Sequence, residues 1–206
     1  MTLGYWDKIY HDLAPSKPLY DNWLDKYEGM LKQSIDTPII DLGCGKGNNA
    51  LYLTERKFKV IACDQSQVAI ELINTYVPQA ATKVFDINKG LPFDSASAKI
   101  IIADLSLHYF SWSDTEKIIS DIQRVLLPEG YLLARLNSTN DTEHFAGQGT
   151  LIEDNYYGVN GTHKRFFEKT QIDKFFKDWR IDYVEEYQLD RLSKSKILWE
   201  VCCKKQ

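Results

Sequence analysis

The sequence predicts a doubly wound α/β fold with a mostly parallel seven-stranded sheet and an antiparallel C-terminal strand. Short apolar runs alternate with helical patterns along the first two thirds of the chain, and this alternation is typical of strands joined by right-handed crossovers. A glycine-rich turn follows the first run. The last two runs, residues 181–189 and 196–203, are separated only by a polar turn, which indicates a closing hairpin.

Length and composition indicate one globular domain spanning residues 1–206. The chain has 44% hydrophobic and 26% charged residues, as soluble domains do, and it has no apolar run long enough for a membrane span. Its net charge of −4 argues against a nucleic-acid partner. Acidic residues near the start argue against a signal peptide. Four cysteines without metal-binding spacing indicate no metal site and a reduced, cytoplasmic protein.

The first apolar run and the turn after it, residues 38–53, are the most informative stretch. Asp41 ends the run, and Gly43, Gly45 and Gly47 follow at alternate positions. This pattern predicts a strand, a tight turn and a helix start, where glycines let a ligand approach the backbone. A dinucleotide-binding turn would place its third glycine at position 48, so the spacing disfavours a pyrophosphate ligand. A glycine-rich turn of some other α/β protein is the alternative.

The acidic-x-Gly-x-Gly-x-Gly pattern resembles the first motif of the class I S-adenosylmethionine-dependent methyltransferases. The resemblance covers residues 38–137 and implies a Rossmann-like fold with S-adenosylmethionine as the cofactor. In that family the turn lies under the methionine and ribose moieties of the cofactor. The residues that the resemblance places against the cofactor are Asp41, Gly43, Cys44, Gly45, Gly47, Asp64, Gln65, Asp86, Ile87 and Leu105.

Two further acids end apolar runs. Asp64 follows residues 60–63 and lies about twenty residues after the glycine turn, where an acid is expected to accept hydrogen bonds from both ribose hydroxyls. Its alternative role is the N-cap of a helix that begins near Ser66. Asp86 lies in a third run, residues 83–87. The resemblance implies that Asp86 and the backbone of Ile87 contact the adenine, and the alternative for Asp86 is a turn-initiating role.

The strongest buried-strand pattern, residues 100–103, leads into a Leu-x-Leu-His sequence that ends at His108. This resembles the fourth methyltransferase motif in its small-molecule form. The Asn-Pro-Pro-Tyr sequence of enzymes that methylate amino groups of nucleic-acid bases is absent. The ordinary pKa of histidine suits a general base, and the alternative is that His108 packs at a helix start.

The first 35 residues are expected to form a helical cap. Aromatic and aliphatic residues recur at helical spacing over residues 6–13 and again over residues 19–27, with prolines between them. The segment resembles the N-terminal part of the tellurite-resistance-like methyltransferases, where it covers the cofactor. The matching positions are Trp6, Tyr10 and Ser16. The alternative is a pair of helices that only pack on the sheet.

The methyl acceptor is expected beyond the fourth and fifth strands. Residues 115–127 predict a helix ended by Pro128 and Gly130, and residues 131–137 predict the fifth strand. Residues 138–165 follow directly and lack apolar periodicity, so they are predicted to form a long loop that could close as a lid. The candidate acceptor residues are Ser106, His108, Tyr109, Arg135 and Asn137.

Arg135 is unusual because it ends an otherwise apolar strand. A buried charge without a partner would be costly there. Its partner is either a protein carboxylate, such as Asp104 or Glu143, or an anionic group of the substrate, which a guanidinium can bind through two hydrogen bonds.

These patterns together predict a methyltransferase for a small molecule or metalloid. The sulfonium of the cofactor is a good leaving group, so placing a nucleophile in line and excluding water can suffice without a catalytic side chain. One alternative is a non-catalytic S-adenosylmethionine-binding or interaction protein. A second alternative is a nucleotide-cofactor oxidoreductase, which the glycine spacing disfavours. The sequence does not determine the oligomeric state.

Overall fold

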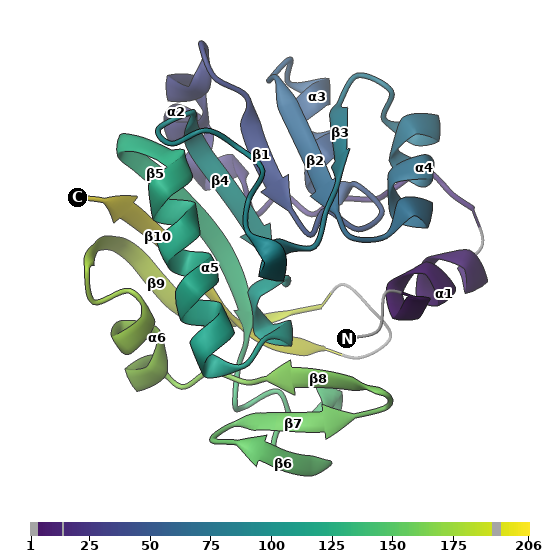
Figure 1. Ribbon diagram of the computed structural model, residues 1–206, viewed down its shortest axis with the longest axis vertical. Helices are drawn as coiled ribbons and strands as arrows, with labels where there is room; N and C mark the ends of the chain where they lie inside the picture. The colour runs from purple at the N-terminus through teal and green to yellow at the C-terminus, as the bar shows by residue number, and fades with distance from the viewer. Residues whose placement is uncertain (1–3, 14, 191–194) are drawn as a thin grey trace.

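Seven strands form one sheet in the computed structural model, which describes residues 4–13, 15–190 and 195–206 (Figure 1). The first five strands pair in parallel, and β10 runs antiparallel to both β5 and β9. The predicted fold class is therefore confirmed. In the order in which they lie side by side, the strands are β3 (Ala81–Val84), β2 (Val60–Asp64), β1 (Ile39–Leu42), β4 (Ala98–Asp104), β5 (Leu126–Asn137), β10 (Lys196–Lys205) and β9 (Trp179–Leu189).

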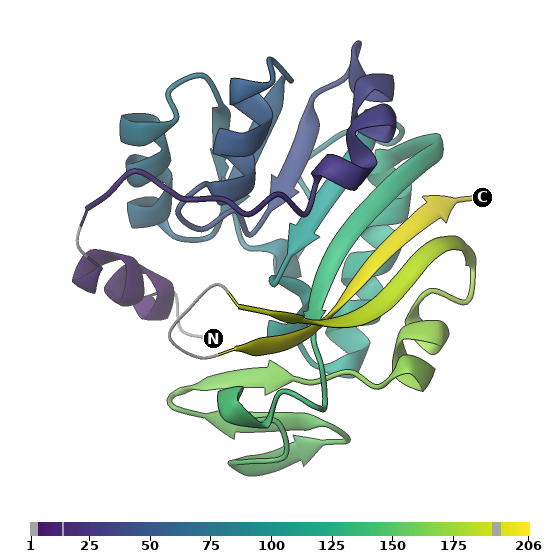
Figure 2. The ribbon, with the colours of Figure 1, turned by 180° about the vertical axis from the view of Figure 1, so that it is seen from behind.

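Helices cover both faces of this sheet. Successive strand side chains point to opposite faces, so Ile40 and Ile101 pack with α5 (Trp112–Val125) and α6 (Lys169–Phe175). Both helices lie in front of the sheet in Figure 1. The neighbouring side chains Ile39, Ile100 and Ile102 pack on the opposite face. The helices there, seen in front in Figure 2, are α2 (Glu28–Leu31), α3 (Asn48–Glu55) and α4 (Gln67–Tyr76).

The boundary between α5 and β5 differs from the prediction. The helix ends at Val125, and β5 already begins at Leu126, so the Pro-Glu-Gly sequence lies inside the strand. The register between β4 and β5 shifts there, and Glu129 has a positive φ of 60°. A bulge of this kind accommodates extra residues within a ladder, which explains why residues typical of a turn occur within a strand.

The N-terminal segment contains one helix of more than a single turn, not two. α1 (Gly4–Asp12) is followed by an extended stretch, the 3-10 turn η1 (Asp25–Tyr27), α2 and a second 3-10 turn, η2 (Lys32–Ser34). The predicted helix over residues 19–27 is wrong. Tertiary bonds hold this segment instead, because Trp23 Nε1 donates to Asn49 Oδ1 at 3.0 Å and the Tyr27 hydroxyl donates to Glu200 at 2.5 Å.

Residues 138–165 are more regular than their sequence predicts. After the 3-10 turn η5 (Thr142–His144) they form a separate antiparallel sheet of β6 (Thr150–Glu153), β7 (Tyr156–Val159) and β8 (Thr162–Arg165). This small sheet lies beyond the ends of β4 and β5, near α1 in the lower part of Figure 1. Asn155 and Asn160 adopt positive φ in the two connecting turns. The strands are too short and too polar to show a periodicity in the sequence.

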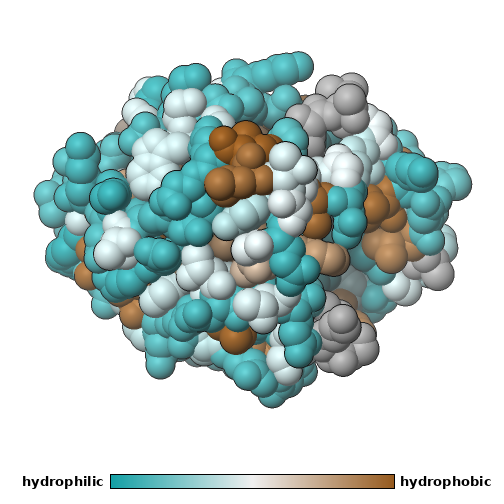
Figure 3. Space-filling model, turned by 90° about the horizontal axis from the view of Figure 1, so that it is seen from below, coloured by the Kyte–Doolittle hydropathy of each residue, from teal (hydrophilic) through white to brown (hydrophobic). Residues whose placement is uncertain are grey.

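The surface below the sheet can be described for the residues that are not grey in Figure 3. Seen from below, it is mostly hydrophilic, and its hydrophobic side chains form separate small groups (Figure 3). None of the helices in the described ranges is long and apolar enough to cross a bilayer.

The first prediction compares a buried with an exposed isoleucine. Ile102 in β4 has no exposed surface, whereas Ile152 in β6 is 46% exposed. Replacing Ile102 with alanine leaves a cavity, so Ile102→Ala should lower the free energy of unfolding by about 2–5 kcal/mol. Ile152→Ala, the matched control, should change it by less than about 0.5 kcal/mol. Urea unfolding of both variants measures the difference, and equal effects would contradict the packing of β4 in the core.

Candidate functional site

The glycine turn brings three other segments close to its backbone. Gly43 and Gly45 have positive φ of 69° and 52°, a region that L side chains avoid. A Cβ on Gly43 would lie 2.5 Å from Ser106 Cβ, and one on Gly45 would lie 2.8 Å from the Tyr10 hydroxyl. The two glycines therefore let the turn lie directly against the segment after β4 and against α1. Gly47 instead faces Ile73 of α4.

Asp64 holds this turn from the end of β2. Its Oδ2 accepts a hydrogen bond from the Gly45 N–H at 2.9 Å, and its Oδ1 accepts one from the Ser66 N–H at 3.0 Å. Ser66 is the N-cap of α4, because its hydroxyl accepts from the Ala69 N–H. The alternative role of Asp64 as the N-cap is therefore wrong. The Gln65 N–H also bonds this carboxylate, which has about four acceptor sites in all, so acceptor capacity remains. Burial raises the pKa of Asp64.

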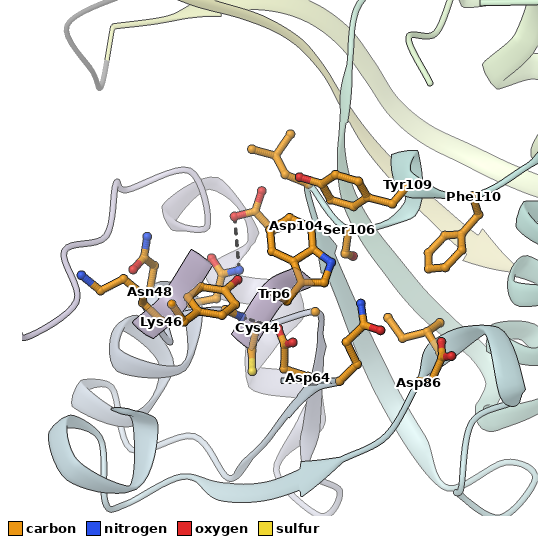
Figure 4. Close-up of a pocket in the computed structure, with 17 residues that line it drawn as sticks. Trp6, Cys44, Lys46, Asn48, Asp64, Asp86, Asp104, Ser106, Tyr109 and Phe110 are labelled. Atoms are coloured by element: carbon orange, nitrogen blue, oxygen red, sulfur yellow. Dashed lines mark hydrogen bonds between the residues drawn. The ribbon is translucent and has the colours of Figure 1, made fainter. Parts of the chain in front are cut away.

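A cavity of about 290 Å³ lies between the turn, the end of β4 and α1 (Figure 4). Most of the residues predicted to contact the cofactor line it. These are Trp6, Tyr10, Gly43, Cys44, Gly45, Asp64, Gln65, Asp86, Ile87 and Leu105, together with the candidate acceptor residues Ser106 and Tyr109.

Aromatic side chains cover this cavity from the N-terminal side. Trp6 and Tyr10 of α1 are stacked, with ring centroids 6.0 Å apart. Trp6 also meets Tyr109 edge to face, with ring centroids 4.9 Å apart, and Figure 4 shows the two together above the cavity. Tyr109 belongs to the 3-10 turn η4 (Leu107–Tyr109), which follows β4. The rings of α1 thus line the cavity, and their role in covering a cofactor stays a prediction. Ser16 lies outside the cavity and accepts a hydrogen bond from Lys46.

Several predicted residues do not line the cavity. Besides Gly47 and Ser16 they are Asp41, His108, Arg135 and Asn137. Asp41 lies fully buried below it, where its Oδ1 accepts a long hydrogen bond of 3.4 Å from Asn49. His108 is also buried, and its Nδ1 has no hydrogen-bond partner in the described structure. If His108 only packs at the start of a helix, its Nδ1 stays buried without a hydrogen-bond partner among the residues described.

Arg135 finds its anion within the protein. Its Nε and Nη2 donate to the two carboxylate oxygens of Asp104, each at 2.7 Å, and its Nη1 donates to Asp21 at 2.8 Å. The guanidinium also lies 4.6 Å from the Trp23 ring centroid. The structure thus favours a protein carboxylate over a substrate anion as the partner of Arg135, and the carboxylate is Asp104 and not Glu143.

The cavity is acidic and aromatic. Its lining carboxylates are Asp64, Asp86 and Asp104, against one lining cation, Lys46. Such a site suits a ligand that carries positive charge and a flat ring, because carboxylates attract cations and aromatic side chains pack against both. It does not suit a pyrophosphate, which would place two more negative charges beside Asp64 and Asp86, while Arg135 balances the charge of Asp104.

Sequence reasoning missed some of the lining residues. They are Lys46, Asn48, Asn49, Asp104 and Phe110. Asn49 matters most, because its amide nitrogen donates to Asp104 Oδ2 at 3.3 Å as well as to Asp41. One sequence feature could have revealed Asn49. The alanine and leucines that follow it mark the buried face of α3, and an amide side chain at a buried helix position needs hydrogen-bond partners.

Comparison with known proteins finds similarity to methyltransferases. Residues 39–130 match a family model described as a methyltransferase domain. The tRNA N(3)-methylcytidine methyltransferase of Drosophila melanogaster is 27% identical over 82% of this chain and 58% of its own length. A SAM-dependent methyltransferase structure from Methanosarcina mazei has a TM-score of 0.73 at 21% identity, covering 91% of this chain and 98% of that one. TehB from Haemophilus influenzae has a TM-score of 0.65 at 18% identity, covering 98% and 66%.

Residues 39–130 therefore correspond to a methyltransferase domain, and the fold is that of S-adenosylmethionine-dependent methyltransferase structures. The match spans 58% of the Drosophila relative, 53% of a putative methyltransferase of Bacillus subtilis and 43% of an uncharacterized methyltransferase of Synechocystis. The chain therefore corresponds to about half the length of these relatives. At 18% identity, the likeness to TehB shows the fold alone. That this chain belongs to the tellurite-resistance-like group therefore stays a prediction.

The second prediction concerns Asp41 and pH. Burial, and then the nearby Asp104 carboxylate, raise the pKa of Asp41 to about 7. An unfolded chain releases this proton near pH ~3.9. Between the two values the folded state binds the extra proton, so the free energy of unfolding falls as pH rises, by at most about 1.4 kcal/mol per pH unit.

Asp41→Asn removes this dependence. Relative to the wild type, the variant should gain stability as pH rises from about 4 to about 7, with no further gain above that range. Urea unfolding across this pH series measures the difference. Asp94→Asn, at an exposed turn, is the control and should show a constant difference. A constant difference for Asp41→Asn as well would contradict the raised pKa.

Proposed function

We propose that this chain transfers the methyl group of S-adenosylmethionine to a small molecule. The acidic and aromatic cavity at the glycine turn carries the proposal, because its chemistry matches this cofactor. S-adenosylmethionine carries a purine, a ribose and two positive charges, the sulfonium and the ammonium, against one carboxylate. The residues present therefore fit the cofactor, and when bound it supplies an activated methyl group.

The side chains divide the work of binding. Asp64 accepts hydrogen bonds from the ribose hydroxyls through the free acceptor sites that the turn leaves on its oxygens. Asp86 and Ile87 contact the adenine. Asp104 also lines the cavity, but Arg135 balances its charge, so its oxygens would serve the methionine moiety as hydrogen-bond acceptors.

The aromatic cover provides the second requirement of methyl transfer. Trp6 and Tyr10 from α1 and Tyr109 from η4 surround the same space. They exclude water and narrow the directions from which an acceptor can reach the methyl group, so that proximity and orientation lower the barrier.

A small acceptor suits the mouth of the cavity better than RNA does. A second hollow shares Asp86 and Tyr109 with the cavity and continues to Asp114 and Glu153 beside the small sheet. Of the carboxylates at this entrance, Asp114 and Glu153 are paired with Lys117 and Arg165, which leaves Asp86. It is therefore mainly the net charge of −4 that disfavours a phosphate backbone. The similarity to a tRNA methyltransferase favours tRNA as a second candidate acceptor, which direct assay distinguishes.

The two other interpretations predict different binding. An oxidoreductase would bind NAD in the cavity, which Asp64 and Asp86 disfavour. A non-catalytic protein would bind S-adenosylmethionine but leave it intact in the presence of every acceptor. Formation of S-adenosylhomocysteine with an acceptor separates this interpretation from the enzyme.

The third prediction is cofactor selectivity. Calorimetry should show binding of S-adenosylmethionine and S-adenosylhomocysteine, and no binding of NAD. Asp64→Ala removes charge-assisted hydrogen bonds of about 1.5–3 kcal/mol, and it also frees the Gly45 N–H. It should weaken binding of S-adenosylhomocysteine at least tenfold, whereas the exposed control Asp94→Ala should not. NAD binding tighter than that of S-adenosylmethionine would overturn the assignment.

The fourth prediction is the class of acceptor. The protein is incubated with S-adenosylmethionine labelled in its methyl group, together with either total tRNA or a protein-free extract of small molecules. Label should appear in the small-molecule fraction and not in tRNA. Affinity for tRNA should be too weak at physiological salt to show the steep salt dependence of phosphate contacts. Labelled tRNA would overturn the small-molecule proposal and leave cofactor binding intact.

A further inference from the structure

Three polar atoms near η4 are buried without a hydrogen-bond partner among the described residues. They are Ser106 Oγ, His108 Nδ1 and Asn137 Oδ1. An unsatisfied buried group costs about 1–3 kcal/mol, so three of them around one turn indicate a place where a ligand supplies the missing bonds. Ser106 lines the cofactor cavity, whereas His108 and Asn137 do not.

Two lysines contribute to the electrostatic environment of His108 and lower its pKa. Burial first, and then Lys196 and Lys164, hold the pKa of His108 well below its usual range, so its imidazole is neutral. Lys164 comes from β8, which packs against η4, and Lys196 begins β10. The small sheet and the terminal hairpin thus bring two cations to the turn that carries Tyr109 into the cavity.

Lys196 forms an ion pair among the described residues, whereas Lys164 has a more distant carboxylate, Asp141, and lies 5.6 Å from the Phe145 ring centroid. Lys196 Nζ lies 3.1 Å from Asp141 Oδ2. The other oxygen of Asp141 accepts hydrogen bonds from the Ile197 N–H at 3.2 Å and from His144 Nδ1 at 2.8 Å, so one carboxylate stands against the two lysines. Lys164 is half-buried, and no described carboxylate lies within 4.0 Å of it. Burial, and then Lys196, lower the pKa of Lys164.

We propose that Lys164 and His108 form a binding site for the carboxylate of a small methyl acceptor, beside the cofactor cavity. This inference rests on the proposed function. The Lys164 ammonium supplies the charge, and the His108 Nδ1–H donates a hydrogen bond to the carboxylate. The Asn137 Oδ1 accepts a hydrogen bond from an O–H or N–H group of the same acceptor.

Charge balance favours a carboxylate over a phosphate. His108 is neutral, and Lys196 is neutralised by Asp141, so the site offers one net positive charge from Lys164. A carboxylate carries one negative charge and cancels it. A phosphate monoester carries up to two and would leave an excess negative charge in a partly buried site.

The position of η4 connects this site with methyl transfer. Ser106, at its start, and Tyr109 line the cofactor cavity, and His108 lies between them in the same turn. A small acid held by Lys164 and His108 therefore lies next to the residues of η4 that line the cavity. Arg135, which the sequence suggested for this role, is already engaged by two protein carboxylates.

The fifth prediction tests anion binding apart from catalysis. Protein with 13C-labelled histidine is saturated with S-adenosylhomocysteine and titrated with sodium acetate, while the His108 ring signal is followed by NMR. The chain has four histidines, and a His108→Gln spectrum assigns the signal. Acetate should give a saturable shift of this signal. Acetamide, which has the same shape without the charge, should give none.

Variants of Lys164 locate the charge. Lys164→Met should weaken acetate binding at least tenfold and leave the melting temperature unchanged or raised, because it removes a half-buried charge that forms no ion pair among the described residues. Lys164→Arg should retain binding. Lys174→Met, on the exposed surface of α6, is the matched control and should bind acetate like the wild type.

Three results would overturn the inference. They are the absence of a saturable shift with acetate, equal acetate affinity in Lys164→Met and the wild type, and tighter binding of inorganic phosphate than of acetate. Failure of the proposed function is seen separately, because calorimetry would then show no binding of S-adenosylhomocysteine. Binding of S-adenosylhomocysteine without binding of acetate would overturn only the carboxylate site.

Discussion

The bidentate pairing of Arg135 with Asp104 is the constraint on which the carboxyl edge of the sheet depends. It joins the ends of β4 and β5, and Asp104 also accepts from Asn49 at the start of α3. Asp21 ties the N-terminal segment to the same guanidinium. Removing one member of such a buried group leaves an uncompensated charge and costs about 3–5 kcal/mol. Asp104 and Asn49, which line the cavity and are here called its floor, are thus part of the network that stabilises the fold.

The roof of the cavity is attached differently. None of the residues of α1 is fully buried, although Trp6 and Tyr10 line the cavity. Its polar anchor is Asp7, which accepts a hydrogen bond of 2.5 Å from the Ser66 hydroxyl at the start of α4. Segments with few buried contacts open locally at low free energy. A rigid floor and a loosely attached roof suit a site that must admit a cofactor and then exclude water.

The sequence predicted what depends on local pattern. The strand runs alternate with helical patterns, and the spacing from Asp41 to Gly47 identified both the turn and its class of ligand. Asp64 followed from its distance along the chain. Each of these signals lies within about twenty residues. The closing hairpin was also predictable, since a polar turn alone separates its two strands.

What the sequence did not predict depends on distant partners. Arg135 needed an anion by simple electrostatics, but its bond to Asp21 spans 114 positions, and nothing local marks it. The strands of the small sheet are four residues each, too short for alternation to be visible. The bulge at Glu129 placed a turn-like sequence inside β5. The helix predicted over residues 19–27 failed because Trp23 and Tyr27 are held by tertiary bonds.

The cavity draws all of its lining from residues 6–110, whereas Lys164 and Lys196 come from the small sheet and the terminal hairpin. The two groups of residues can therefore diversify separately. Substitutions in the last third of the chain can change the proposed acceptor site. They leave the residues that line the cavity unaltered. A descendant of this protein could acquire a new acceptor through β8 and the start of β10 alone.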